Sequence, residues 1–213
     1  MSAGYHDARL PHDVRREIVW GELWRSYFAA LVPPDGCVLD LGCGYGSFIN
    51  TVVAPRRIAV DSWPGFPAHL APGIEPHVAG VTDLDFLETG SVDFAFASNI
   101  FEHISQADLT KVLAQLHRAL SARGTLTLLQ PNYRYAYKEY FDDYTHVSIW
   151  SHESMKDFLT ANGYEVFDVQ PRFLPLTVKS RLPVSTLLVR AWLKSPIKPG
   201  GKQMLIRARP IRD

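Results

Sequence analysis

The chain has 213 residues, with 22 basic and 22 acidic side chains, and this length suits one domain, residues 1–213, with a sizeable core. No apolar stretch reaches the ~18 residues that a membrane-spanning helix needs. The N-terminus lacks the basic start and apolar core of a secretory signal. The two cysteines, Cys37 and Cys43, cannot form a disulfide framework, and no Cys/His cluster has zinc spacing, so we expect a cytoplasmic protein without a metal site.

The charge is unevenly distributed along the chain. Residues 1–170 hold 12 basic and 21 acidic side chains, whereas residues 171–213 hold 10 basic side chains and only one acidic one. This asymmetry predicts that the C-terminal part contacts something anionic. The alternative is that the basic part lies on the acidic body of the same protein.

The first expected element is an N-terminal helix over residues 12–31. Its apolar residues, among them Trp20, Trp24 and Phe28, recur at helical spacing, and Pro33-Pro34 ends it. The aromatic face is expected to pack on the body of the protein.

A glycine-rich stretch follows the next apolar run. Val38 to Leu41 is typical of a buried strand, and the glycines predict a tight turn followed by a helix that extends to about Val53. Glycine tolerates positive φ and lets a ligand approach the backbone closely. The N–H groups at a helix start favour an electron-rich ligand group, and Asp40 could accept hydrogen bonds from it. The pattern predicts a nucleotide-binding cradle.

The glycine spacing separates two nucleotide families. A dinucleotide fingerprint requires G-x-G-x-x-G, but Ser47 stands where the last glycine would be. The stretch instead resembles motif I of the class I S-adenosylmethionine (SAM)-dependent methyltransferases, acid-x-Gly-x-Gly-x-Gly, with Asp40, Gly42, Gly44 and Gly46 in its four places. Under this resemblance the N-terminal helix would cover the cofactor.

A second acidic residue closes the next expected strand, residues 57–61. Asp61 lies 21 residues after Asp40, and neighbouring strands of a doubly wound sheet bring their carboxyl ends into one crevice. Asp61 is therefore expected to accept the ribose hydroxyls; the alternative is an ordinary turn aspartate. Residues 62–76 are rich in proline and predict a loop.

The region 80–103 resembles the second and fourth methyltransferase motifs, with a strand from Asp93 to Ser98-Asn99. The family usually has an aspartate at the position of Gly80, where it contacts the adenine amine, so Asp83 or the backbone around Thr82 would have to make that contact. The resemblance also assigns Tyr45, Ser62 and Ser98 to the cofactor site.

The remaining elements continue the alternation of helices and strands. A capping box at Ser105–Asp108 starts a helix that ends at Gly124. Strands are expected at 77–79, 125–129, 164–169 and 203–208, and a helix at 151–162. This alternation predicts an α/β fold, a doubly wound, mostly parallel sheet with helices on both faces. The resemblance implies a Rossmann-like sheet of seven strands in the order 3-2-1-4-5-7-6, with the last strand antiparallel.

The segment from Gln130 to His146 holds five tyrosines and follows the fifth strand, so it is expected over the carboxyl edge of the sheet. Rigid aromatic rings suit a substrate wall; a surface helix with its rings packed inward is the equal alternative. His146 is the first candidate for a general base because a neutral imidazole takes up a proton near pH 7. The competing candidate is His103.

The insert at 172–202 is long for a hairpin connection. Within 181–198, apolar residues including Leu187, Leu188 and Trp192 form one helical face beside basic residues, which is typical of an interfacial membrane helix. The alternatives are a helix that packs on the body or on a second copy in a homodimer.

Taken with the resemblance, these features predict methyl transfer from SAM to a hydroxyl of a small molecule or a lipid-linked glycan, at the inner membrane face if the insert binds lipid. No motif for nucleic acid and no acidic pair of metal-dependent catechol-type enzymes is present. Two other functions stay open: a cofactor-binding protein without catalysis, and an NAD-binding oxidoreductase, which the glycine spacing disfavours.

Overall fold

A seven-stranded sheet forms the centre of the protein. The structure is a computed structural model that describes residues 14–175 and 185–212. Its strands are β1 (Cys37–Leu41), β2 (Arg56–Asp61), β3 (Glu75–Val78), β4 (Val92–Ser98), β5 (Leu120–Pro131), β6 (Tyr164–Pro175) and β7 (Gly201–Pro210). They lie in the order β3-β2-β1-β4-β5-β7-β6, with β7 antiparallel to both of its neighbours. The expected strand order and the antiparallel last strand are confirmed.

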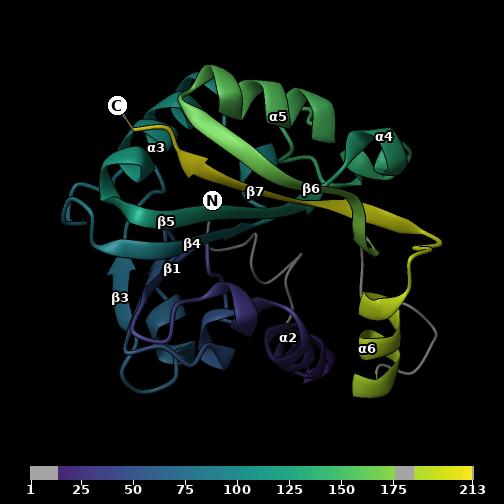
Figure 1. Cartoon of the computed structure of the whole chain (residues 1–213), viewed down its shortest axis with the longest axis horizontal. Coiled ribbons are helices and arrows are strands. Elements are labelled where there is room, and N and C mark those ends of the chain that lie inside the picture. The colour runs from purple at the N-terminus through teal and green to yellow at the C-terminus, as the bar shows by residue number, and fades with distance from the viewer. Residues whose placement is uncertain (1–13, 176–184, 213) are drawn as a thin grey trace.

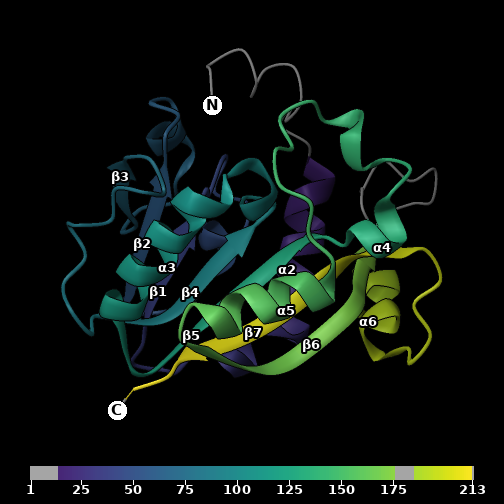
Figure 2. The same cartoon turned by 90° about the horizontal axis from the view of Figure 1, so that it is seen from above.

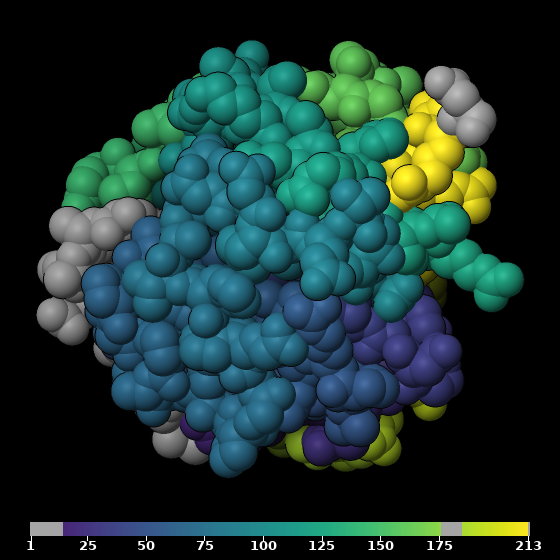
Figure 3. Space-filling view, turned by 90° about the vertical axis from the view of Figure 1, so that its left-hand side faces the viewer, coloured from purple at the N-terminus to yellow at the C-terminus, as the bar shows by residue number. Residues whose placement is uncertain are grey.

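Helices cover both faces of this sheet (Figures 1 and 2). The helices α3 (Gln106–Ala119) and α5 (His152–Ala161) lie on one face, and α2 (Val14–Ser26) and α6 (Thr186–Lys194) lie on the other. A short helix, α4 (Tyr133–Ala136), follows β5. Single 3-10 turns are η1 (Phe28–Leu31), η2 (Ile49–Thr51), η3 (Phe66–His69), η4 (Phe101–His103) and η5 (Tyr140–Asp142). The segment between β2 and β4 covers the β3 side of the molecule (Figure 3).

Successive side chains of a strand point to opposite faces of the sheet and so pack into two separate hydrophobic cores. In β4, Ala95 and Ala97 join the core under α3 and α5, while Phe94 and Phe96 join the core under α2. The second core is aromatic, and Phe28 lies 5.2 Å from Phe96 between ring centroids. Both faces are buried, which explains why β1 is buried along its whole length and is apolar at every position except Asp40.

Side-chain caps fix the starts of two helices where the sequence predicts them. The Ser105 side chain accepts a hydrogen bond from the Asp108 N–H, and Ser151 and Ser154 form a capping box. The end of α3 differs from the prediction, because β5 begins at Leu120 and takes up the residues before Gly124.

The predicted helix from the glycine turn to Val53 is wrong. The chain forms turns followed only by η2 (Ile49–Thr51). Val52 is already extended, and β-branched residues such as Val52 and Val53 favour strands over helices. The Asn50 side chain binds the His69 carbonyl and the Ala71 N–H, which holds the segment against the following loop. The backbone N–H groups of the turn can therefore bind a ligand, but no α-helix begins here to add the partial positive charge of a helix N-terminus.

The helix α6 is held to the body by an ion pair. Arg190 Nε donates to Oε1 of the buried Glu22 on α2 at 2.9 Å. The hydrogen bond from Arg190, and to a smaller extent the one from Ser26, lowers the pKa of Glu22 to about 2. Because this value lies below that of an unfolded glutamate, the pair stabilises the fold above the ordinary carboxyl pKa and loses that effect as the pH falls towards 2. In the described part of the chain, no helix is long and apolar enough to cross a membrane.

Candidate active site

The carboxyl ends of the parallel strands meet at one edge of the sheet. Leu41 at the end of β1 pairs with Val60 of β2 on one side and with Ala97 of β4 on the other. The loops that leave these three strands therefore start side by side. Ligands of open α/β sheets bind in the crevice at this edge.

The glycine turn after β1 is tied down by its neighbours. The N–H groups of Gly42 and Cys43 both donate to the Val60 carbonyl, at 2.8 and 3.1 Å. Gly42, Gly44 and Gly46 all have positive φ, at 67°, 52° and 70°. A Cβ on Gly42 would lie 2.0 Å from Ile100 Cδ1, whereas a Cβ on Gly44 would meet nothing within 4 Å. Gly42 thus allows close packing, and Gly44 leaves open space above the turn.

Asp61 links the second strand to this turn. Its Oδ2 accepts from the Gly44 N–H and its Oδ1 from the Trp63 N–H, both at 2.9 Å. The carboxylate is 5% exposed. Asp61 thus ties the glycine turn to the loop that follows β2. Its contact with the ribose hydroxyls stays a prediction.

Asp40 lies beneath the turn and not at its surface. It is 3% exposed, and burial, opposed by a backbone hydrogen bond from Ile49, raises its pKa to about 8. The charge of Asp61 adds to this rise. A direct contact from Asp40 to a cofactor amine, as the sequence analysis expects, stays a prediction.

The loop after β3 supplies a carboxylate beside Gly80. A Cβ on Gly80 would lie 3.0 Å from Oδ2 of Asp83. The exposed Asp83 therefore places its carboxylate next to the position that the Cβ of an aspartate at residue 80 would occupy. Gln115 on α3 holds this loop in place: its amide donates to the Thr82 carbonyl at 2.5 Å and accepts from the Leu84 N–H at 2.6 Å. This geometry favours Asp83 for the adenine contact.

Tyr45 forms an aromatic group with the loop after β2. Its ring centroid lies 5.0 Å from Trp63 and 4.7 Å from His69. A cavity of about 290 Å³ next to the turn is lined by Tyr45 and six other residues, among them Ser47 and His69. Ser62 is exposed in the same loop, and Ser98 lies at the end of β4, where its hydroxyl accepts from the Asn99 amide.

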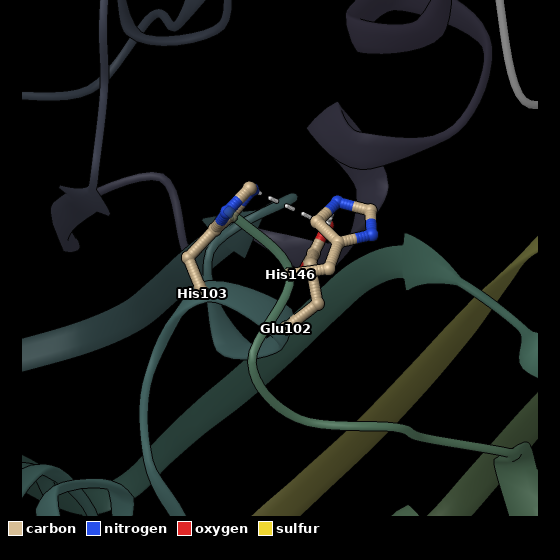
Figure 4. Close-up of side chains that lie close together, drawn as sticks. All are labelled: Glu102, His103 and His146. Atoms are coloured by element: carbon tan, nitrogen blue, oxygen red, sulfur yellow. Dashed lines mark ion pairs between the residues drawn. The ribbon is translucent and has the colours of Figure 1, made fainter. Parts of the chain in front are cut away.

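Both candidate bases occupy one site. His103 ends η4, His146 lies in the loop before α5, and their ring centroids are 4.7 Å apart (Figure 4). Glu102 lies between them, with Oε1 at 4.0 Å from Nε2 of each histidine. Glu102 is fully buried, and burial raises its pKa to about 8. Burial, followed by the neighbouring His146, lowers the pKa of His103 to about 4.

Backbone strain and hydrogen bonds position this histidine–glutamate cluster. Asn99, directly after β4, has φ of 54°, which is uncommon for a residue with a side chain, and its Oδ1 accepts from Gln203 of β7. This turn leads the chain into η4. The Glu102 carbonyl accepts from the N–H groups of Val147 and Ser148, which brings the His146 loop against η4.

The five tyrosines of the predicted wall fall into three groups by their burial. Tyr140 is fully buried, donates its hydroxyl to the Ser148 carbonyl and packs 4.8 Å from the His146 ring. Tyr137 and Tyr144 are 56% and 77% exposed. Tyr133 and Tyr135 are partly buried, and Tyr135 stacks on His152. Tyr140 therefore supports the cluster, and only the exposed rings are available to a substrate.

Three features of the site have little or no signal in the sequence. Glu102 stands beside His103, but nothing local marks it as the centre of a cluster that includes His146. Gln115 lies on the inner side of α3, where its spacing suggests only a helix. The close contact between Gly42 and Ile100 joins two loops, and the sequence of neither loop predicts it.

The chain belongs to a methyltransferase family, whose model, the Methyltransferase domain, matches residues 12–169. No curated protein matches the chain significantly. Solved structures share its fold at low identity. A SAM-dependent methyltransferase from Archaeoglobus fulgidus is 20% identical, with 96% of this chain and 97% of that chain covered and a TM-score of 0.68.

Two further structures extend this similarity. An S-adenosylmethionine-dependent methyltransferase from Mesorhizobium loti is 17% identical, covers 88% of this chain and 97% of its own, and has a TM-score of 0.65. A SAM-dependent methyltransferase from Thermotoga maritima, described as a possible histamine N-methyltransferase, is 18% identical, with coverage of 92% and 91% and a TM-score of 0.64. The family match and this fold support methyl transfer as the activity and SAM as the methyl donor.

The first prediction concerns the open space above Gly44. We expect Gly44→Val to abolish SAM binding in a calorimetric titration, because a β-branched side chain would enter the space left for the cofactor. Gly90→Val is the matched control, since Gly90 also has positive φ, 69°, and no atom within 4 Å of its Cβ. The control should carry similar backbone strain and keep SAM affinity. Unchanged binding by folded Gly44→Val protein would contradict this placement of the cofactor.

The second prediction concerns the Asp61 carboxylate. Asp61→Ala should weaken SAM binding by ~1.5–3 kcal/mol through loss of a charge-assisted contact. Asp93→Ala is the control: Asp93 also accepts from a backbone N–H of the β1 region, that of Cys37 at 2.8 Å, but at the opposite end of the strand. Both variants should lose thermal stability, and only Asp61→Ala should lose affinity. Affinity within twofold of wild type would make Asp61 purely structural.

Proposed function

We propose that this protein transfers the methyl group of SAM to a hydroxyl group of a small molecule or glycan, with the cluster of His103, His146 and Glu102 on the acceptor side. One observation carries the proposal. Two imidazoles, 4.7 Å apart, adjoin a buried carboxyl group directly after β4, at the same edge of the sheet as the glycine turn. A methyl acceptor that must lose a proton would need such a group.

The glycine turn, Asp61 and Asp83 would hold the cofactor, and bound SAM would supply a methyl group already activated by its sulfonium. The acceptor oxygen forms a bond to the methyl carbon while the carbon–sulfur bond breaks, which leaves a methyl ether and S-adenosylhomocysteine. The hydroxyl proton passes to an imidazole, for which His146 is the first candidate. Alignment of the two reactants alone can supply ~7–11 kcal/mol of the barrier reduction.

The surface beside this cluster supports an acceptor with an apolar or ring-shaped part. Between α4 and α5, five large hydrophobic side chains are at least about half exposed: Tyr137, Phe141, Tyr144, Val147 and Ile149. Exposed apolar groups gathered on one segment are typical of a binding surface. Sugar rings pack well on such aromatic side chains, so the strip suits a glycan or an aromatic alcohol.

The test is turnover with a panel of acceptors. We expect purified protein to convert SAM to S-adenosylhomocysteine with alcohols or glycans, and His146→Ala to reduce turnover ~10²–10⁴-fold with SAM affinity intact. His117→Ala is the control, because His117 lies at the end of α3 and binds the Ile211 carbonyl.

Three outcomes would contradict parts of the proposal. Turnover only with amines would replace the hydroxyl with a nitrogen acceptor. Activity that survives in His146→Ala but is lost in His103→Ala would reverse the two histidine roles. SAM binding without turnover on any acceptor would favour a cofactor-binding protein that has no catalysis.

We further propose that α6 brings the protein to an anionic membrane surface that carries a lipid-linked acceptor. Leu187 and Leu188 are 72% and 50% exposed on α6, and Ile197 just after it is 73% exposed. The surrounding residues 171–213 carry 10 basic side chains and one acidic one. Apolar burial and attraction to anionic lipid act together in interfacial helices.

Several side chains of α6 bind the body of the protein and so are not available to this proposed surface. The Trp192 indole N–H donates to the Phe173 carbonyl, and Arg190 binds Glu22, so both groups hold α6 to the body. Val189 and Leu193 pack on the core under α2. The start of the predicted helical segment 181–198, residues 181–184, lies outside the described residues. Leu187 and Leu188 are therefore the residues to test, in place of Trp192.

We expect the protein to sediment with anionic vesicles, less so with neutral vesicles or at high salt, because salt screens charge within ~8 Å at physiological strength. Leu187→Ala with Leu188→Ala should release it. Val53→Ala with Ile211→Ala is the matched control, since these residues are 81% and 53% exposed elsewhere. Wild-type protein that ignores anionic vesicles, or a double variant that converts a dimer to a monomer, would overturn the membrane role and favour a soluble acceptor.

A further inference from the structure

Three groups that commonly bind metal ions converge beside β4. One donor atom from each of Glu102, His103 and His146 lies within 4.8 Å of the other two. Each histidine Nε2 lies 4.0 Å from Glu102 Oε1, and the histidine side chains are 8% and 9% exposed (Figure 4). Two residues come from η4 and the third from a loop distant in sequence, so the fold itself assembles the group.

The Thr145 backbone fixes the orientation of one imidazole. The Nδ1 atom of His103 lies 3.2 Å from the Thr145 carbonyl oxygen, which can only accept, so Nδ1 carries the proton. The Thr145 hydroxyl donates to Asp143 Oδ1 at 2.6 Å and lies 2.9 Å from the same Nδ1. His103 Nε2 is then the basic nitrogen, directed towards Glu102. Histidine ligands of metals are usually fixed in this way, by a carbonyl or carboxylate on the other ring nitrogen.

The burial of Glu102 favours the binding of a cation. Glu102 is 0% exposed, and within the described residues no other residue donates a hydrogen bond to either of its carboxylate oxygens. A buried carboxylate that accepts no hydrogen bond from another residue is costly. Proteins ordinarily satisfy such groups with a hydrogen bond, an ion pair or a metal ion.

We propose that Glu102, His103 and His146 bind a divalent transition-metal ion, such as Zn²⁺, Co²⁺ or Mn²⁺. Two imidazoles and one carboxylate favour these ions, whereas Mg²⁺ and Ca²⁺ prefer oxygen ligands. Sites with three protein ligands keep a coordination position open to water or substrate. The donors have to approach by about an ångström or less to reach zinc distances of ~2.0–2.2 Å, which side-chain rotations can provide.

This inference goes beyond the proposed function and assigns the same residues a second role. With an ion bound, His146 is a ligand, and the ion can polarise an acceptor hydroxyl in the open position. His146→Ala then removes activity whether the residue is a base or a ligand, so turnover does not separate the two roles. Metal binding, measured without acceptor, does.

The experiment is a titration of chelator-treated protein with Zn²⁺ and Co²⁺, followed by calorimetry, by the Co²⁺ absorption spectrum and by the melting temperature. We expect one ion per chain, a raised melting temperature and little response to Mg²⁺. Ligand binding to the native state alone raises thermal stability in this way. His103→Ala and His146→Ala should each weaken binding at least ~100-fold, since even changes behind the ligands commonly cost 10–100-fold. His117→Ala should bind as wild type does.

Glu102→Gln serves as a variant in which metal binding can be lost while the fold is kept. It removes the buried charge but retains the shape, so in chelator its melting temperature should equal or exceed that of the wild type, while the metal-dependent rise is lost. SAM titration confirms that each variant is folded. The proposal is overturned if the wild type binds no stoichiometric ion, or if Glu102→Gln and His103→Ala bind it as tightly as the wild type. S-adenosylhomocysteine formation tests the proposed function separately.

Discussion

The site depends on a close approach between two loops at the carboxyl edge of the sheet. Ile100, just after β4, lies over Gly42 so closely that a Cβ there would be 2.0 Å from Ile100 Cδ1. The turn at Asn99, the residue before Ile100, leads the chain from β4 towards η4. Glycine at position 42 thus allows the loop after β4 to lie close to the glycine turn, because any side chain there would push the two loops apart.

The two sides of the site are supported by different interactions. The cofactor side is held by backbone hydrogen bonds between the glycine turn, Val60 and Asp61. The acceptor side is held by the Glu102 carbonyl, which binds two N–H groups of the 147–148 segment. The glycine turn and the histidine–glutamate cluster are thus held by separate sets of hydrogen bonds.

Local patterns predicted most strands and the glycine turn because both follow from neighbouring residues, whereas the strand order followed from the resemblance to class I methyltransferases. Continuous apolar runs mark buried parallel strands, and an acid followed by three alternating glycines marks the turn. The same local reasoning failed at residues 46–53, where Val52, Val53 and the side chain of Asn50 prevent the expected helix. It also could not anticipate that His103 and His146, first considered as rivals, lie 4.7 Å apart with Glu102 between them. Tertiary contacts, not spacing, create that cluster.

We propose that the glycine turn holds SAM with its methyl group directed towards the histidine–glutamate cluster. A crystal structure with bound S-adenosylhomocysteine tests this most directly. The account predicts the ribose hydroxyls on Asp61, the adenine amine near Asp83 and the sulfur facing the side of His103 and His146. A cofactor that lies elsewhere, or whose sulfur points away from the two histidines, would contradict the account.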